Sequence, residues 1–392
     1  MDFRLSPSEE KWRQDVRAFL SEALPSDYEG DVGVGGPGDI DMGRAFNKKL
    51  AERGWMAPAW PRAYGGLDAS FVEQLIFNEE LSYYRAPEGM RVFAIGMIGP
   101  TLIVHGSDAQ KREYLPRITG AEVIWCQGYS EPGAGSDLAS LQTRAVRDGD
   151  DYVINGQKIW TTGAHVADWI FVLTRTNPDA PKHKGISFFL ADMKSPGINV
   201  RPIINMAGEH HFNEVFFEDV RVPARNMVGP ENGGWYVAMT LLDFERSSIG
   251  AVASGRRTLD DLTVYAKERR VNGKPLAGQP QVRYKLAELT LEFEVGRWFG
   301  YSIASMQQRG QIPNREASQA KVFATELNQR LHNFGIGILG LYGGLEPRSR
   351  YAPLHGVIEI GHLVNVAPTI YSGTNEIQRN IIAQRGLGLP RD

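Results

Sequence analysis

The sequence has almost no cysteine, no long apolar run and little net charge. Cys126 is the only cysteine among 392 residues, so we expect no internal disulfide, a buried core thiol and a reducing, cytoplasmic compartment. No stretch approaches the roughly 20 apolar residues of a membrane span, and the first residues contain neither a signal nor a transit peptide. The formal net charge of −3 gives no electrostatic basis for binding nucleic acid.

Apolar spacing divides the chain into a helical part, 1–120, a β part, 121–228, and a second helical part, 229–392. Ser6-Pro7-Ser8-Glu9 is a capping box that predicts the start of the first helix. Short runs of β-branched and aromatic residues in the middle predict a small barrel or sandwich. Long helical periods predict a C-terminal four-helix bundle, with helices over about 233–270, 281–309, 314–341 and 351–371 and a last helix near 375–385.

Two segments of the β part have compositions that are typical of a ligand-binding loop and of a hairpin. Residues 128–137 read Gly-Tyr-Ser-Glu-Pro-Gly-Ala-Gly-Ser-Asp, a tight loop that offers hydroxyls and backbone N–H groups to a ligand. Residues 155–162 read Asn-Gly-Gln-Lys-Ile-Trp-Thr-Thr. Because Asn-Gly favours a type I′ turn, we predict a hairpin that turns at Asn155-Gly156.

These two segments, in this order and spacing, resemble the flavin-binding β domain of the acyl-CoA dehydrogenase family. The helix–β–helix order matches the family over essentially the whole chain. The resemblance therefore implies an α+β fold with an N-terminal helical domain, a middle β domain and a C-terminal four-helix bundle. It also implies FAD as the cofactor, in contact with Gln127, Tyr129, Ser130, Ser136, Trp160, Thr162, Arg269, Thr374 and Glu376. The alternative for Trp160 is an ordinary core side chain.

The family removes an α-proton from an acyl thioester with a Glu that most members carry in a Tyr-Glu-Gly-Thr motif. Here the motif reads Tyr371-Ser372-Gly373-Thr374, so the usual base is absent. A minority of members place the Glu in a Glu-Arg pair on a bundle helix, and Glu245 followed by Arg246 resembles that position. The resemblance thus implies Glu245 as the base. An exposed Glu-Arg pair on a helix surface is the alternative.

Other family roles follow from the same resemblance. The backbone N–H of Ser372 would bind the thioester carbonyl, which Ser can do as well as Glu. Asp243, Arg246 and Ser136 would contact the acyl-CoA. No metal is implied.

Parts of the pattern that reaches a neighbouring subunit are altered, since the family's Phe is missing from 269–273 and Gly337 stands for a Gln. We expect a homotetramer, because the family usually forms one, and these alterations leave a heterotetramer open.

The predicted reaction is an FAD-dependent oxidation of acyl-CoA to 2,3-enoyl-CoA, with electrons passing to an electron-transfer flavoprotein or a similar carrier. A non-catalytic partner subunit and an acyl-CoA oxidase of the same fold are the alternatives. Gly33–Gly38 matches G-x-G-x-x-G, but it follows no strand and opens no helix, which argues against a dinucleotide site. Glu209-His210-His211 lacks a spaced third ligand, so a solvated loop is favoured over a metal site.

Overall fold

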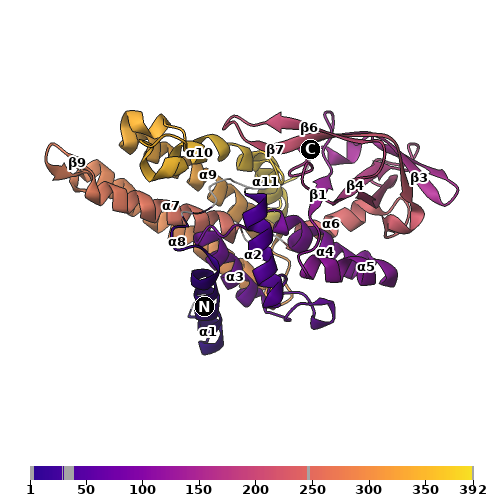
Figure 1. Ribbon diagram of the computed structural model, residues 1–392, viewed down its shortest axis with the longest axis horizontal. Helices are drawn as coiled ribbons and strands as arrows, with labels where there is room; N and C mark the ends of the chain where they lie inside the picture. Colours follow the sequence, from indigo (N-terminus) through magenta and orange to yellow (C-terminus); the bar gives the residue numbers. More distant parts are fainter. Residues whose placement is uncertain (1–3, 29, 31–38, 245–247, 391–392) are drawn as a thin grey trace. The chain divides into compact units, whose positions relative to one another are not determined.

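The computed structural model describes residues 4–28, 30, 39–244 and 248–390. Its contacts form two compact units (Figure 1). The helical unit consists of Met1–Val34, Ala69–Ala86 and Arg246–Asp392, and the sheet unit consists of Gly35–Asp68 and Pro87–Glu245. The Gly33–Gly38 motif lies outside the described residues, and no described helix has the length and apolarity that crossing a bilayer requires. The domain limits 1–120, 121–228 and 229–392 stay a prediction.

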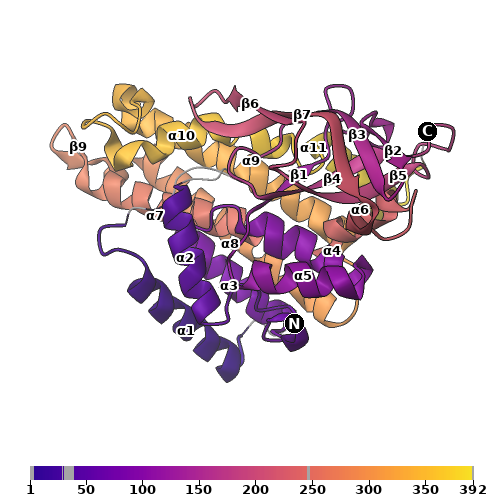
Figure 2. The same cartoon turned by 45° about the vertical axis from the view of Figure 1, so that its right-hand side comes forward.

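Three long helices, α7, α8 and α9, pack side by side in the helical unit (Figures 1 and 2). Their shared core contains Leu259, Leu289 and Leu327, all fully buried. A capping box at Ser6 starts α1, which confirms the predicted start, and a second capping box at Ser70 starts α3. The elements of this unit are α1 Pro7–Ala23, α3 Phe71–Tyr83, α7 Ile249–Glu268, α8 Pro280–Gln308, α9 Asn314–Leu339, α10 Val357–Val364, α11 Asn375–Ile381 and the hairpin β9 Arg270–Val271 with β10 Lys274–Pro275.

Two of the predicted long helices are wrong in extent. The first, 233–270, is two helices, because α6 ends at Phe244 and α7 begins at Ile249 after Ser248, whose φ is +53°. The second, 351–371, contains the short α-helix α10 between the 3₁₀ turns Pro353–Gly356 and Ala367–Thr369. Leu354 and His355 have left-handed backbones before α10, and Pro368, which lacks an N–H group, lies in the 3₁₀ turn after it.

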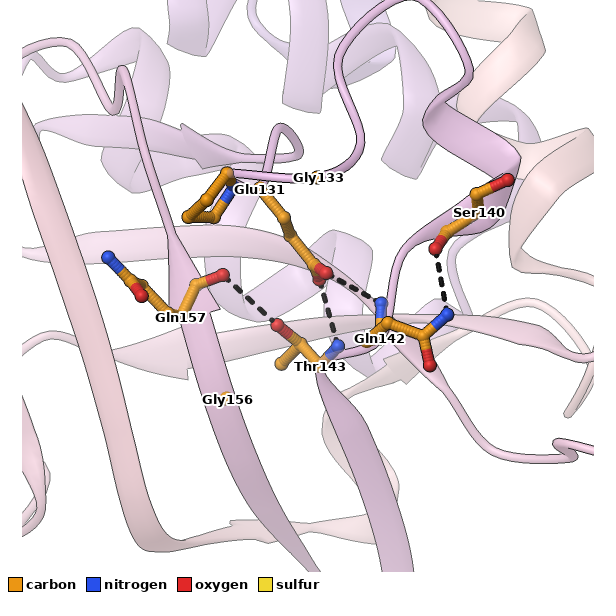
Figure 3. A pocket seen from close by; sticks show the side chains of 8 residues that line it. Glu131, Gly133, Ser140, Gln142, Thr143, Gly156 and Gln157 are labelled. Atoms are coloured by element: carbon orange, nitrogen blue, oxygen red, sulfur yellow. Dashed lines mark hydrogen bonds between the residues drawn. The ribbon is translucent and has the colours of Figure 1, made fainter.

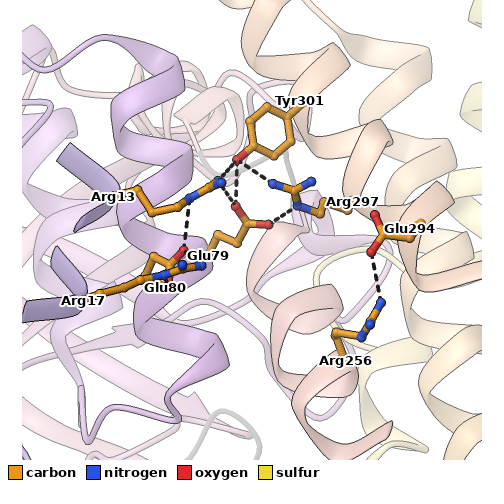
Figure 4. Close-up of polar contacts among 8 residues, drawn as sticks. All are labelled: Arg13, Arg17, Glu79, Glu80, Arg256, Glu294, Arg297 and Tyr301. Carbon is orange, nitrogen blue, oxygen red and sulfur yellow. Dashed lines mark hydrogen bonds and ion pairs between the residues drawn. The ribbon is translucent and has the colours of Figure 1, made fainter. Parts of the chain in front are cut away.

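Partly and fully buried charges join α1, α3 and α8 (Figure 4). The carboxylate of Glu79 accepts hydrogen bonds from Arg13 at 2.8 Å and from the Tyr301 hydroxyl at 2.7 Å, and it also pairs with Arg297. Glu80, which is 2% exposed, accepts from Arg17 Nε at 2.8 Å. Because each carboxylate has cationic partners, the three helices are connected without an unpaired buried anion.

In the described part of the sheet unit, eight strands form one mixed sheet in the order β6-β7-β3-β2-β4-β5-β8, with β1 parallel to β4 (Figure 2). Buried Cys126 lies in its core, as predicted. The strands are β1 Trp125–Gly128, β2 Arg144–Asp148, β3 Asp151–Lys158, β4 Trp169–Arg175, β5 Ile186–Asp192, β6 Ile198–Ile204, β7 His210–Pro223 and β8 Met227–Val228, and the helices are α2 Ile40–Glu52, α4 Gly99–His105, α5 Asp108–Thr119 and α6 Gly234–Phe244.

The hairpin predicted at Asn155-Gly156 is wrong. β3 runs through both residues, and the two-residue turn lies earlier, at Gly149-Asp150 between β2 and β3. Gly156 is required because a Cβ there would approach the Cα of Thr143 to 2.6 Å. The Asn155 amide exchanges two 3.0 Å hydrogen bonds with Asp219, where β7 carries an extra residue opposite β3. The dipeptide therefore accommodates a β-bulge rather than a turn.

Candidate active site

The two motifs of the β part lie side by side in the sheet unit. β1 leads into the loop that begins at Tyr129, and β3 leads into Ile159 and Trp160. The Ile159 N–H donates a 2.9 Å hydrogen bond to the Ser130 carbonyl, so the main chains of the motifs are joined directly. The sequence-predicted residues Tyr129, Ser130 and Trp160 are thereby brought together.

A buried ion pair fixes this junction. Lys158 is fully buried, and its Nζ lies 2.7 Å from Glu131 Oε1 and 3.1 Å from the Tyr129 carbonyl. The Glu131 carboxylate also accepts hydrogen bonds from the N–H groups of Gln142, at 2.6 Å, and Thr143, at 2.9 Å (Figure 3). One carboxylate and one ammonium therefore hold together the loop at 129–131, strand β3 and the segment 142–143.

The ionisation of the pair follows from its burial. Burial lowers the pKa of Lys158 to about 8, against the opposing attraction of Glu131. Burial alone would raise the pKa of Glu131, but the Lys158 ammonium and the N–H donors hold that pKa below its ordinary value. Both groups are consequently charged at neutral pH.

A pocket of about 540 Å³ adjoins the loop (Figure 3). Its lining residues are Glu131, Pro132, Gly133, Ser140, Gln142, Thr143, Gly156 and Gln157. None of these carries a positive charge, and the one carboxylate is already committed to Lys158. The pocket therefore offers amides and hydroxyls, and it lacks the cation that a phosphate group would favour.

Trp160 is not a core residue, so that alternative is wrong. Its side chain is 57% exposed, and its backbone adopts a left-handed φ of +59°. The ring contacts Phe212 edge-on at a centroid distance of 5.9 Å. Hydrogen bonds from Ile159 N–H on one side and from Thr161 N–H to the Asn213 carbonyl, at 3.0 Å, on the other hold the residue in this conformation. The sheet unit thus exposes an indole at its surface.

Two buried hydroxyls nearby are unsatisfied. The Tyr129 Oη and Thr161 Oγ1 atoms have no hydrogen-bond partner among the described residues. The Tyr129 ring packs edge-on against Phe171 and Phe188, and its burial raises its pKa. Exposed Trp160, the unpartnered hydroxyl of Thr161 and partly buried Thr162 are consecutive, and they combine an aromatic face with hydroxyl groups, which suits the polar-edged ring of a flavin.

The structure also describes three further predicted residues of the sheet unit, Gln127, Ser136 and Asp243. Gln127 is partly buried at the end of β1, where its Nε2 lies 3.8 Å from the Met97 sulfur. Ser136 is exposed in the loop. Asp243 lies in the last turn of α6. Glu245 and Arg246 are outside the described residues.

In the helical unit, Ser372 lies in an exposed loop with a left-handed φ of +53°, followed by Gly373 at +77°. No described group accepts a hydrogen bond from the Ser372 N–H. Thr374 caps α11, accepting from the Ile377 N–H at 3.2 Å, and Glu376 is exposed in the first turn. Arg269 is exposed at the end of α7 and is not grouped with these residues by any described contact.

The solvated loop expected at Glu209-His210-His211 is also wrong. His211 is buried, and the His210 ring stacks on His165 at 3.9 Å while its Nε2 lies 2.8 Å from the buried Asn213 Oδ1. Strand β7 begins here, which is why the histidines are ordered against the sheet. Among the residues the structure describes, no group of three or more His, Cys, Asp or Glu could hold a metal.

Family models identify the protein class. The N-terminal, middle and C-terminal domain models of acyl-CoA dehydrogenases match residues 6–122, 126–220 and 232–387. The chain therefore belongs to the acyl-CoA dehydrogenase family, and it is an FAD-dependent oxidoreductase with the family's helix–β–helix fold.

Particular relatives share the full length. The acyl-CoA dehydrogenase IpdE1 of Mycobacterium tuberculosis is 38% identical over 389 residues, which are 98% of each chain. FadE26 of the same organism is 37% identical over 407 residues, covering 100% of this chain and 99% of the relative. Among solved structures, the Tcur3481-Tcur3483 steroid ACAD has a TM-score of 0.92 at 36% identity, and the ChsE4-ChsE5 complex from Mycobacterium tuberculosis has 0.90 at 35%, each covering all of both chains.

Sequence reasoning did not find the Glu131–Lys158 pair, although both residues belong to the quoted motifs. The signal was available. Lys158 continues the even-numbered, inward-facing positions of β3 after Tyr152 and Ile154, where an apolar residue is the norm. A charged residue at such a position needs a buried partner.

Proposed function

We propose that this chain oxidises an acyl-CoA thioester to its 2,3-enoyl-CoA with Glu245 as the base and the Ser372 N–H as the donor to the thioester carbonyl. One observation carries the assignment of the base. The position where most of the family carries its Glu is Ser372, whereas the Glu-Arg pair of the minority is present as Glu245-Arg246. The backbone around Ser372 supports the second role, because its N–H is uncommitted among the described residues.

Glu245 and Ser372 have different roles in the proposed reaction. The Glu245 carboxylate takes the α-proton, and exclusion of water by the bound acyl chain makes it a stronger base. The Ser372 N–H donates to the thioester oxygen and stabilises the charge that develops when the proton leaves. FAD supplies the hydride acceptor when it is bound. Asp243, Arg246 and Ser136 are proposed to hold the CoA.

The FAD contacts are proposed for the residues that the sequence singled out. The exposed indole of Trp160 and the unsatisfied hydroxyl of Thr161 support this assignment in the sheet unit. The complete proposed set is Gln127, Tyr129, Ser130, Ser136, Trp160, Thr162, Arg269, Thr374 and Glu376.

We further propose a bulky, ring-bearing acyl group as the substrate. A neighbour of 36% identity over the full chain is described as a steroid ACAD, and Ser at 372 is smaller than the Glu of most members. Two neighbours are described with two named components, which supports assembly with a second related chain rather than with identical copies alone. An electron-transfer flavoprotein or a similar carrier is the proposed electron acceptor.

Anaerobic stopped-flow reduction of the flavin by a panel of straight-chain, branched and steroid acyl-CoA thioesters tests the mechanism. Glu245→Gln should retain FAD but react at least about a thousandfold more slowly, since general bases contribute roughly 10² to 10⁴. Glu288→Gln, an exposed change on α8, is the control and should react normally. Adding Ser372→Glu to Glu245→Gln should restore part of the rate, because the family places its carboxylate at either position.

The other outcomes identify the alternatives. Normal reduction in Glu245→Gln would place the base elsewhere. An FAD-loaded wild type that no thioester reduces would indicate a non-catalytic subunit. Oxygen uptake that keeps pace with turnover in the absence of a carrier would indicate an oxidase.

A further inference from the structure

The loop that carries Ser372 is held by a lysine that no motif of the sequence singled out. Lys321, on α9, donates from Nζ to the Gly373 carbonyl at 2.8 Å and to Asn375 Oδ1 at 2.9 Å. Gln378 Nε2 donates to the Ser372 carbonyl at 3.1 Å. Both carbonyls that follow the Ser372 N–H are thus restrained by side chains.

This restraint acts on an unfavourable backbone. Ser372 and Gly373 are consecutive left-handed residues, and a non-glycine residue rarely adopts this conformation without support. The loop is exposed, so packing contributes little to its shape. Hydrogen bonds to its carbonyls are therefore the main described means of fixing the direction of its N–H groups.

We propose that Lys321 is a positioning residue of the reaction, which holds the Ser372 amide in the orientation that binds the thioester carbonyl. The proposal rests on the function proposed above for Ser372. Burial lowers the pKa of Lys321 to about 8, while Glu376 and Glu326 oppose this shift, so the ammonium persists at neutral pH.

A purely structural role would be to dock α11 on α9, but other contacts already do this. Asn375 is 3% exposed and donates to Thr325 Oγ1 at 3.1 Å and to Glu326 Oε1 at 3.2 Å. Arg379 also pairs with Glu326. Of the cations that connect these two helices in the described chain, Lys321 is the one that contacts the Ser372-Gly373 loop.

The test compares Lys321→Met with Arg379→Met. Each removes a cation between α9 and α11, but only the first releases the loop. The readout is the infrared carbonyl stretch of a bound 2-enoyl-CoA carrying ¹³C at the thioester carbon, made from the acyl-CoA that reduces the wild-type flavin fastest. Hydrogen bonding lowers this frequency. Lys321→Met should lose most of the lowering seen in the wild type, and Arg379→Met should keep it.

Kinetics give the second readout. Lys321→Met should retain FAD and a near-normal KM, while its limiting rate of flavin reduction falls at least about tenfold, because a displaced donor is lost mainly in the transition state. Lys321→Arg should recover part of both signals. If Lys321→Met does not fold, Lys321→Gln replaces it in the same comparison.

The outcomes separate this inference from the function on which it rests. A wild type whose bound thioester shows no lowered carbonyl frequency would refute the role of Ser372 itself. A lowered frequency in the wild type that persists fully in Lys321→Met would refute the role of Lys321. Equal losses in Lys321→Met and Arg379→Met would reduce Lys321 to a helix contact.

Discussion

Lys158→Met is the sharpest test of how the 128–137 and 155–162 segments are joined. Met is unbranched and apolar like the stem of Lys158 and only one atom shorter than the whole side chain, but it leaves Glu131, which is 8% exposed, without its cation. Breaking a buried pair in this way costs about 3–5 kcal/mol. At about 2.1 cal/mol/K per residue, 392 residues have an unfolding entropy of about 0.8 kcal/mol/K, so the melting temperature should fall by roughly 4–6 °C.

The chain offers a matched control in Lys182→Met. Lys182, in the connection between β4 and β5, pairs at the same 2.7 Å with Asp137, which ends the 128–137 loop, but the side chains are 50% and 59% exposed. Loss of an exposed pair costs about 1 kcal/mol or less, so the melting temperature should change by about 1 °C at most. Differential scanning calorimetry of both variants, with and without added FAD, supplies the comparison.

Adding Glu131→Gln to Lys158→Met should recover part of the lost stability, because no uncompensated charge then remains in the core. Lys158→Met should also bind FAD more weakly than Lys182→Met, since the released loop carries Ser130. If Lys158→Met melts within a degree of the wild type, the pair does not hold the junction and the reasoning fails. A double variant less stable than Lys158→Met would likewise contradict it.

Two further variants test separate parts of the molecule. Trp160→Ala should weaken FAD binding by about tenfold or more, as expected for loss of an aromatic contact. The melting temperature of the FAD-free protein should stay unchanged, because the indole is exposed. Equal FAD affinity of variant and wild type in equilibrium titrations would contradict this. Burial lowers the pKa of His332 to about 4, so the unfolded chain takes up the proton near pH 6.5 and the folded chain only near pH 4. The free energy of unfolding therefore has its full value from this group above pH 7, and it falls by about 3 kcal/mol as the pH falls toward 4, because the unfolded chain binds the proton first. His332→Asn should flatten this slope in melting temperatures measured from pH 7 to 4.5, and an unchanged slope would show that other groups cause it.

The sequence was sufficient for features whose signals are local. The capping box at Ser6 and the apolar spacing of α8 and α9 depend on neighbours within a few residues, and the structure agrees with them. The helix–β–helix order followed from the same signals. The shortened α10 was missed because backbone conformations such as those of Leu354 and His355 have no reliable sequence pattern.

Contacts between residues far apart in the sequence could not be predicted from local patterns. Asn155-Gly156 has the composition of a tight turn, and only the approach of Thr143 and the bond to Asp219, 64 residues away, show its actual use. Lys158 and Lys321 likewise depend on groups far along the chain. The proposed base, Glu245, rests on family resemblance alone, so its assignment stays a prediction.

The bulge in β7 determines which residues of that strand belong to the core. Before it, odd-numbered residues such as Asn213 and Phe217 are buried, whereas after it even-numbered ones such as Val220 and Val222 are buried. Deletion of Asp219 would therefore remove the extra residue and leave Phe217 and Val220 two positions apart, on the same face of an uninterrupted strand. Deletion of a residue away from the bulge would instead shift every side chain on one side of the deletion to the opposite face. A one-residue deletion should therefore be tolerated better at the bulge than elsewhere in this strand.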